Sequence, residues 1–130
     1  MLYHVSICVE DVERSARFYD AVLATIGMKR VHERSGFFVA YGGDHGEFWI
    51  QSPRMQDFLV VSTASHYAFT AKSADEVRAF HAAALAAGGK NAWGPKSDPA
   101  FGLNFLGCVV TDLDGNLPEC FVYPHDGPDP

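Results

Sequence analysis

The chain has 130 residues, of which 48% are hydrophobic and 20% charged, and its formal net charge is −6. This length and composition are those of one ordinary globular domain with enough apolar residues for a core. Nucleic acid and acidic membrane surfaces are disfavoured as partners, because both require a basic face and the longest basic run is the pair Lys29-Arg30.

The first part of the chain predicts a strand, a helix and three further strands. Residues 2–9 alternate in polarity with period two, which indicates a strand with His4 on its polar face. Asp11 is suited to cap a helix, and Gly27 is suited to end it, because glycine tolerates the left-handed conformation found there. Three short strands are predicted after the helix, over residues 28–33, 36–41 and 47–51.

The second part repeats this order after a linker over residues 54–64. His66 opens an alternating strand over residues 66–71. Ser73 and Glu76 have the spacing of a capping box, in which each side chain accepts a backbone N–H at the start of the helix, with Glu76 reaching back to Ser73. Three more strands are predicted, over residues 90–93, 104–110 and 117–123, with a loop over 94–103.

An offset of 62 residues aligns the two parts without a gap and places His4 on His66. Further identities at this offset include Phe18 with Phe80, Ala21 with Ala83, Leu23 with Leu85 and Gly27 with Gly89. We therefore predict an α+β fold in which modules 1–53 and 65–124 form a single domain, residues 1–130. Its eight strands would form a curved, partly closed sheet around a cleft, with the helices outside and the two histidines at equivalent positions.

The lack of a recognisable targeting segment and the pattern of cysteines lead us to expect a cytoplasmic protein. The sequence has no run of about 18 apolar residues and no basic-then-apolar leader. Cys8, Cys108 and Cys120 lie in apolar, strand-like runs without the spacing of a zinc site, so we expect reduced core residues.

Several stretches resemble the vicinal oxygen chelate superfamily, which includes glyoxalases, bleomycin-resistance proteins and extradiol dioxygenases. The first module carries His4-Val5-Ser6-Ile7, Asp11, Arg14-Ser15, Phe18-Tyr19 and Leu23. The segment Asp112-Leu113-Asp114-Gly115-Asn116-Leu117-Pro118-Glu119 resembles the D-x-D-G-N-x-x-E signature of that group. The resemblance covers roughly residues 2–123.

The resemblance implies a metal site at His4, His66 and Glu119, since the superfamily takes its ligands from the first and last strands of each module. Two neutral imidazoles and a carboxylate leave open positions on a divalent ion such as zinc, nickel, manganese or iron. The ion would act as a Lewis acid on a small oxygenated substrate. The implied protein is a metal-dependent lyase, isomerase or dioxygenase, and related proteins often form homodimers, sometimes with sites shared between chains.

The fourth ligand position of such a site is ambiguous in this sequence. Glu47, Trp49 and Gln51 share one parity on the strand over 47–51, and Glu47 or Gln51 would be the fourth ligand or base, whereas Trp49 would leave three ligands. Aromatic side chains would line the substrate pocket, namely Trp49, Phe101, Phe121 and Tyr123, with Gln51 beside them. The alternative is a metal-free protein that binds or sequesters a small molecule in the manner of bleomycin resistance.

Overall fold

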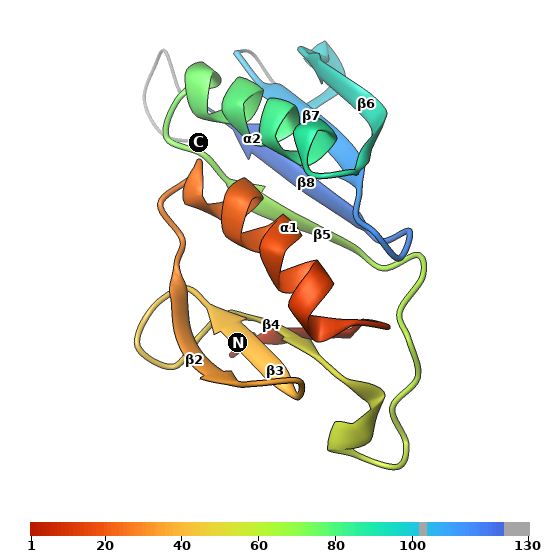
Figure 1. Ribbon diagram of the computed structural model, residues 1–130. Coiled ribbons are helices and arrows are strands. Elements are labelled where there is room, and N and C mark those ends of the chain that lie inside the picture. Colours follow the sequence, from red (N-terminus) through yellow and green to blue (C-terminus); the bar gives the residue numbers. More distant parts are fainter. Residues whose placement is uncertain (102–103, 124–130) are drawn as a thin grey trace.

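Two β-α-β-β-β successions follow one another in the computed structural model, which describes residues 1–101 and 104–123 but not the side chain of Phe101 (Figure 1). The first contains β1 (Val5–Cys8), α1 (Val12–Ala24), β2 (Arg30–Arg34), β3 (Phe38–Tyr41) and β4 (Phe48–Gln51). The second contains β5 (His66–Thr70), α2 (Ala74–Ala86), β6 (Lys90–Lys96), β7 (Leu106–Thr111) and β8 (Leu117–Val122). Two short 3₁₀ turns, η1 (Pro53–Met55) and η2 (Pro99–Phe101), lie between strands.

The strands form two four-stranded sheets with the same topology. Their orders are β1-β4-β3-β2 and β5-β8-β7-β6, so the two sheets are built alike. The first strand of each module is parallel to the last, and the other neighbours are antiparallel. A parallel pair needs a long crossover connection, which here includes the helix of the module. The predicted α+β fold with two βαβββ modules is therefore confirmed, and its sheets are curved but not closed.

Each helix begins at the predicted capping residue. The side chain of Asp11 accepts the backbone N–H of Arg14 at 3.1 Å, and that of Ser73 accepts the N–H of Glu76 at 3.1 Å. The Glu76 carboxylate accepts the N–H of Lys72 at 2.6 Å, one residue before the Ser73 N–H that a capping box would use. Both helices are thus fixed at their first turn, directly after the first strand of each module.

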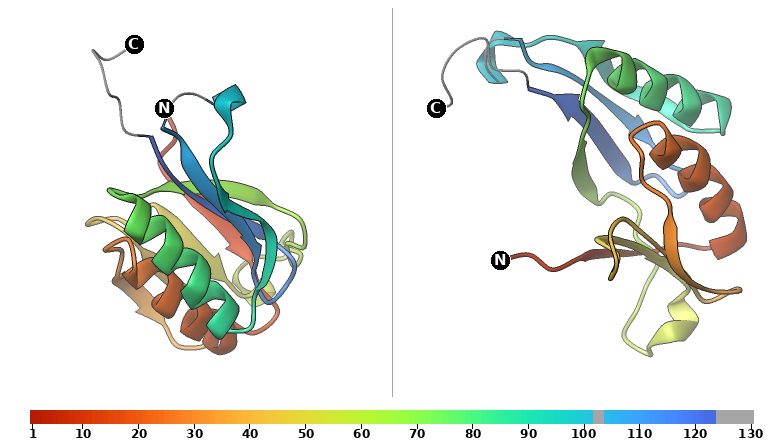
Figure 2. Two further views of the ribbon diagram at one scale, coloured as in Figure 1. Left: turned by 90° about the horizontal axis from the view of Figure 1, so that it is seen from above. Right: turned by 90° about the vertical axis from the view of Figure 1, so that its left-hand side faces the viewer.

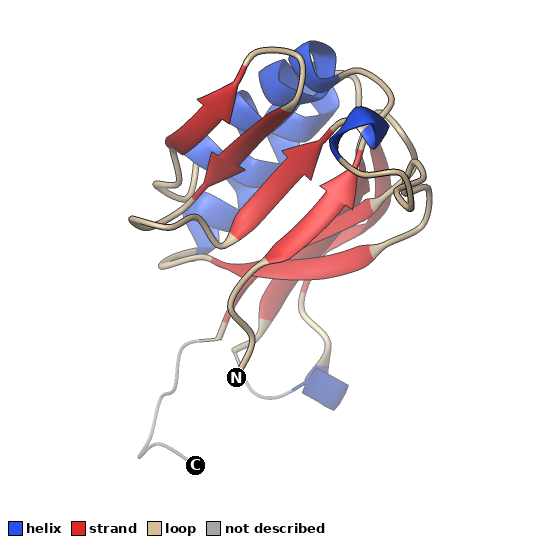
Figure 3. Ribbon diagram, turned by 90° about the horizontal axis from the view of Figure 1, so that it is seen from below, coloured by secondary structure: helices blue, strands red, loops and turns tan. Residues whose placement is uncertain are grey.

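The core lies between the helices and one face of each sheet. Figure 2 shows α1 and α2 side by side on the same side of the molecule, and Figure 3 shows the first sheet from its other, open face. Alternation along the strands separates the two faces: Cys120 is fully buried toward the helices, whereas its neighbours Glu119 and Phe121 are only half-buried. One hydrophobic cluster spans both modules and includes Ile7, Tyr19, Leu23, Ile50, Val77, Phe80 and Val110.

A buried hydrogen-bond network joins the two modules beside α1. The Tyr19 hydroxyl lies 2.7 Å from Oδ2 of Asp112 and 2.5 Å from the hydroxyl of Tyr67. Asp112 also accepts the backbone N–H groups of Asp114 and Asn116, so it organises the turn before β8 as well. Burial raises the pKa of Tyr19 and of Tyr67 above the usual value near 10.

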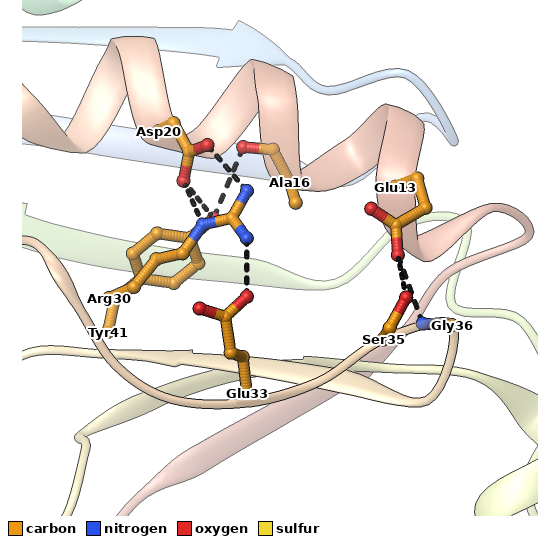
Figure 4. Close-up of polar contacts among 8 residues, drawn as sticks. All are labelled: Glu13, Ala16, Asp20, Arg30, Glu33, Ser35, Gly36 and Tyr41. Atoms are coloured by element: carbon orange, nitrogen blue, oxygen red, sulfur yellow. Dashed lines mark hydrogen bonds and ion pairs between the residues drawn. The ribbon is translucent and has the colours of Figure 1, made fainter.

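A second polar network holds the β2–β3 hairpin against α1 (Figure 4). Arg30 makes two short contacts with the carboxylate of Asp20, at 2.8 and 2.6 Å, and a third with Glu33 at 2.9 Å. The buried hydroxyl of Tyr41 donates to Asp20 at 2.9 Å. Because these charged groups satisfy one another, the network explains the hairpin's position and is not a strong candidate for a binding site.

Two expectations from composition can be compared with the described residues. The three cysteines are free and buried, as predicted for reduced core residues. Over residues 1–101 and 104–123, neither helix has the length and apolar content needed to cross a membrane.

Candidate functional site

His66 and Glu119 meet on the open face of the second sheet. The parallel β5–β8 pairing places Ala68 opposite Glu119, and the His66 side chain lies on the same face two residues earlier. The Nε2 atom of His66 lies 3.1 Å from Oε1 of Glu119, and its Nδ1 atom lies 2.9 Å from the carbonyl oxygen of Leu117. The imidazole is about half exposed and the carboxylate is 22% exposed, so both can contact a ligand from solution.

The hydrogen bond from His66 to Leu117 determines which ring nitrogen carries a proton. A carbonyl oxygen can only accept, so Nδ1 must carry a proton and donate it to Leu117. In a neutral imidazole, Nε2 then presents a lone pair to the Glu119 carboxylate, and two lone-pair groups at 3.1 Å repel each other. A proton or a metal cation between Nε2 and Glu119 removes this repulsion. The pair is therefore suited to hold either an imidazolium ion or a divalent metal.

A pocket of about 610 Å³ surrounds this pair, and we call it the sheet-2 pocket. Its described lining residues are His66, Trp93, Asp98, Phe105, Val109, Glu119, Phe121 and Tyr123. Cross-strand pairing aligns Trp93 with Val109 and Val109 with Glu119, and it aligns Gly107 with Phe121. The pocket is thus polar at the His66–Glu119 end and aromatic toward the end of β8.

Gly107 allows the aromatic part of this pocket to form. The ring of Phe105 stacks on that of Phe121 with centroids 5.7 Å apart and 23° between planes. A Cβ atom at Gly107 would lie 2.8 Å from the Phe105 ring, so a side chain there would displace it. Glycine at this position lets the Phe105 ring lie against the sheet, next to Phe121.

His4 and Trp49 lie on the open face of the first sheet, away from these residues. The rings of His4, His32 and Phe38 lie with centroids 5.8, 6.2 and 5.1 Å from that of Trp49, and we call this group the first-sheet face. The indole N–H of Trp49 donates to the carbonyl of Gly46 at 3.1 Å. His4 is not among the described lining residues of the sheet-2 pocket, so one chain brings together two of the three predicted ligands.

The remaining predicted site residues have different positions. Glu47 precedes β4 and is exposed, and its carboxylate accepts the N–H of Gly43 at 2.6 Å, so it holds its own turn. Gln51 ends β4 on the same face as Trp49, where it is half-buried and paired with Cys8 and Phe38. The side chain of Phe101 lies outside the described residues.

Four described residues of the sheet-2 pocket were absent from the sequence-based site: Trp93, Asp98, Phe105 and Val109. Val109 could have been found, since it shares the strand parity that places Glu119 on the open face. Trp93 was harder to find, because β6 contains irregular pairing on both sides of it. Asp98 follows β6 in a segment for which the sequence predicts only a loop.

A divalent metal fits this chain in part. His66 and Glu119 supply one nitrogen and one oxygen donor with the orientation that ligands need, and the Leu117 carbonyl fixes the tautomer that leaves Nε2 available. Within residues 1–101 and 104–123, no three His, Cys, Asp or Glu side chains gather closely enough to hold a metal. A complete site therefore requires at least one further donor from outside this group, such as a substrate oxygen or a second chain.

The fold and site together define a paired βαβββ protein with a His–Glu pair in an aromatic pocket. The family model described as "Glyoxalase/Bleomycin resistance protein/Dioxygenase superfamily" matches residues 2–120. The chain belongs to this superfamily, as its sequence motifs predict. No curated protein matches the chain.

Solved structures with the same fold agree with this assignment. A glyoxalase/bleomycin resistance protein from Albidiferax ferrireducens T118 is 30% identical, with 93% of this chain and 97% of that chain covered and a TM-score of 0.78. A glyoxalase-related enzyme from Fulvimarina pelagi is 22% identical, with coverage of 95% and 88% and a TM-score of 0.76. A lactoylglutathione lyase from Agrobacterium tumefaciens is 17% identical, with coverage of 94% and 92% and a TM-score of 0.69.

Proposed function

We propose that this protein is a divalent-metal-dependent enzyme, a lyase, isomerase or dioxygenase, that acts on a small oxygenated substrate in the sheet-2 pocket. His66 and Glu119 would hold the metal, which would act as a Lewis acid on a substrate oxygen when bound. The observation that carries the proposal is the 3.1 Å contact between Nε2 of His66 and Oε1 of Glu119, with Nδ1 engaged by Leu117. The aromatic side chains beside the pair would exclude water and orient the substrate.

We propose further that the protein is a homodimer and that His4 of the partner subunit completes the ligand set. His4 lies on the exposed first-sheet face, whereas His66 and Glu119 lie on the open face of the second sheet. Superfamily members often form dimers, and a second copy could place its first-sheet face over the pocket. This arrangement would explain why one chain gathers only two of the three predicted donors.

Metal content provides the test of this function. The parent protein is expected to contain nearly one divalent metal per chain by elemental analysis, and His66→Ala and Glu119→Ala should each weaken metal binding at least tenfold. The matched control is His81→Ala, because His81 lies on α2, bonded to Asn91 and away from the pocket. A parent protein that takes up no zinc, nickel, manganese or iron in titration calorimetry would contradict the proposal.

Mixing two inactive variants tests whether the site is shared. His4→Ala and Glu119→Ala alone should each bind metal at least tenfold more weakly than the parent, but their heterodimer has one site with all three ligands. An equimolar mixture should therefore recover metal at about a quarter of the sites, since half of the dimers are mixed. A single-chain site would recover none, and sedimentation analysis would report the oligomeric state directly.

A second candidate is a metal-free binding protein. The aromatic lining of the sheet-2 pocket favours it, since Phe105, Phe121 and Tyr123 could hold a planar molecule without a metal. Ligand affinity unaffected by chelator, together with failed metal uptake, would support this function instead.

A further inference from the structure

We propose that the sheet-2 pocket selects small aryl compounds that bear an oxygen donor at one end and no negative charge at the other, and that Asp98 is the residue that rejects anions. The inference rests on the proposed function for one point only, because it places the oxygen donor of the ligand at the His66–Glu119 pair. The selection itself follows from the charges and rings of the pocket.

The charged groups differ between the two ends of the pocket. At the polar end, the Glu119 carboxylate contacts His66 at 3.1 Å, and Nζ of Lys96 lies 4.8 Å from the centroid of the Trp93 ring. Asp98 and Glu119 carry carboxylates, and none of the described lining residues is a lysine or an arginine. At the aromatic end, the other described lining residues are Phe105, Phe121 and Tyr123, so an anionic substituent there would be repelled by Asp98 and would find no cationic partner among them. A neutral or cationic group avoids this penalty.

The polar and aromatic groups are arranged in successive rows along the strands. Trp93, Val109 and Glu119 form the first row, and Gly107 and Phe121 form the second. Phe105 and Tyr123 come next, with ring centroids 6.5 Å apart. Residues two apart on a strand are separated by about 7 Å, so a ligand oxygen at Glu119 places a benzene ring over the second row.

The rings of the second and third rows form a preformed surface for a flat ligand. Phe105 is only 7% exposed and stacks on Phe121, so its orientation is fixed before a ligand arrives. Offset stacking on such a surface favours an aromatic ring over a flexible chain.

Asp98 lies at the aromatic end of the pocket. Lys96 pairs with Gly107, and the chain continues from there toward the Phe105 side. The Asp98 carboxylate accepts the backbone N–H of Ala100 at 2.9 Å, which fixes its orientation. A substituent on the ring opposite the oxygen donor would therefore approach Asp98, where its charge decides whether the ligand is accepted.

Three matched probes test the selection: acetophenone, 4-acetylbenzylamine and 4-acetylbenzoate. They share one acetyl oxygen and one ring, and they differ only in the charge of the para substituent. Affinities are measured by ligand-observed NMR on chelator-treated protein, so that a carboxylate cannot bind a metal. We expect the amine to bind best and the carboxylate worst, with steps of about two- to fivefold, the range of partly exposed charge pairs.

Two variants and a control assign the selection to named residues. Asp98→Asn should remove the advantage of the amine and leave acetophenone within twofold of the parent, whereas Phe121→Ala should weaken all three probes about tenfold. Asp57→Asn is the control, since Asp57 is an exposed carboxylate of the linker.

The outcomes separate this inference from the proposed function. Equal or stronger binding of 4-acetylbenzoate, an unchanged order in Asp98→Asn, or no binding of any probe overturns the inference, even if the protein takes up metal normally. Loss of metal uptake with the expected order of probes overturns the metal-dependent function and leaves the charge selection intact.

Discussion

The hydroxyl of Tyr19 has one proton and two oxygen neighbours, so the direction of each hydrogen bond can be assigned. Asp112 is acceptor-only when ionised, and Tyr19 must therefore donate to it at 2.7 Å. Tyr67 then donates to Tyr19 across the 2.5 Å contact. Removing the Tyr19 hydroxyl breaks both bonds and leaves Oδ2 of Asp112 with the Asn116 side-chain amide at 3.0 Å as its donor, whereas removing the Tyr67 hydroxyl leaves the Tyr19–Asp112 bond in place.

Tyr19→Phe should lower the free energy of unfolding by about 1–3 kcal/mol, because it leaves the buried Asp112 oxygen with one donor fewer. Tyr67→Phe should cost less, since it removes only the outer bond of the network. Urea denaturation measures both, with Tyr3→Phe as the control at a residue that is 63% exposed. Equal losses for Tyr19→Phe and Tyr3→Phe would contradict the assignment.

Single residues also show where sequence reasoning was limited. The alternation of residues 2–9 and 66–71 correctly placed His4 and His66 on polar strand faces, since parity depends only on local sequence. The role expected of Glu47 stays a prediction, but the structure places it before β4, where its carboxylate binds Gly43. A carboxylate four residues after a glycine turn can close that turn, and strand parity alone does not reveal this contact.

At the scale of the helices, the two modules end α1 and α2 differently, although the 62-residue offset aligns Gly27 with Gly89. Gly27 has φ +79 and open space around its Cα, so glycine serves there for backbone conformation. In the second module, the positive φ occurs one residue earlier, at Gly88 with φ +104. Gly89 is needed for space, because a Cβ there would lie 2.4 Å from the carbonyl oxygen of Thr111.

Alanine at these two glycines should therefore have unequal effects. Gly89→Ala should lower the free energy of unfolding by about 1–3 kcal/mol, because the added Cβ would clash with the backbone of β7, which is held in the sheet. Gly27→Ala should cost about 1 kcal/mol from backbone conformation alone. Thermal unfolding by circular dichroism compares the two variants, and a larger loss for Gly27→Ala would be inconsistent with this account.

The strands of both sheets could be predicted from local sequence. Strand positions follow from alternation and turn residues, so the eight strands were anticipated within a few residues. The extent of β6 was missed, because Gly94 and Pro95 indicate a turn whereas the strand continues to Lys96. Pro118 lies in β8 between two other strands, but the described β7–β8 pairing ends at Glu119, so its missing N–H is not needed for that pairing.

At the scale of the whole molecule, the relative position of the modules was not available from the sequence. The repeat indicates that His4 and His66 are equivalent, but equivalence around an axis does not bring two side chains together. The packing of α1 against α2 and the Tyr19–Tyr67–Asp112 network set this position, and they depend on contacts between residues far apart in the chain. Strand parity is a local property, whereas the distance between His4 and His66 depends on this packing between modules.

The stability of the whole molecule should decrease at high pH, because tyrosines from both modules are buried in its polar networks. Burial raises the pKa of Tyr19, Tyr41 and Tyr67 in the native state, whereas in the unfolded chain it lies near 10. Above about pH 10 the unfolded state therefore binds fewer protons than the native state, and the free energy of unfolding falls as pH rises.

Each tyrosine contributes a slope of up to about 1.4 kcal/mol per pH unit in this range. Tyr41→Phe should be less stable than the parent at neutral pH, since it loses its bonds to Asp20 and to the carbonyl of Ala16, but its stability should fall less steeply above pH 10. Urea unfolding at pH 8, 9, 10 and 11 measures both the free energy of unfolding and its slope with pH. Tyr3→Phe is the control at an exposed tyrosine. Identical slopes for the parent and Tyr41→Phe would show that the alkaline loss arises from other groups.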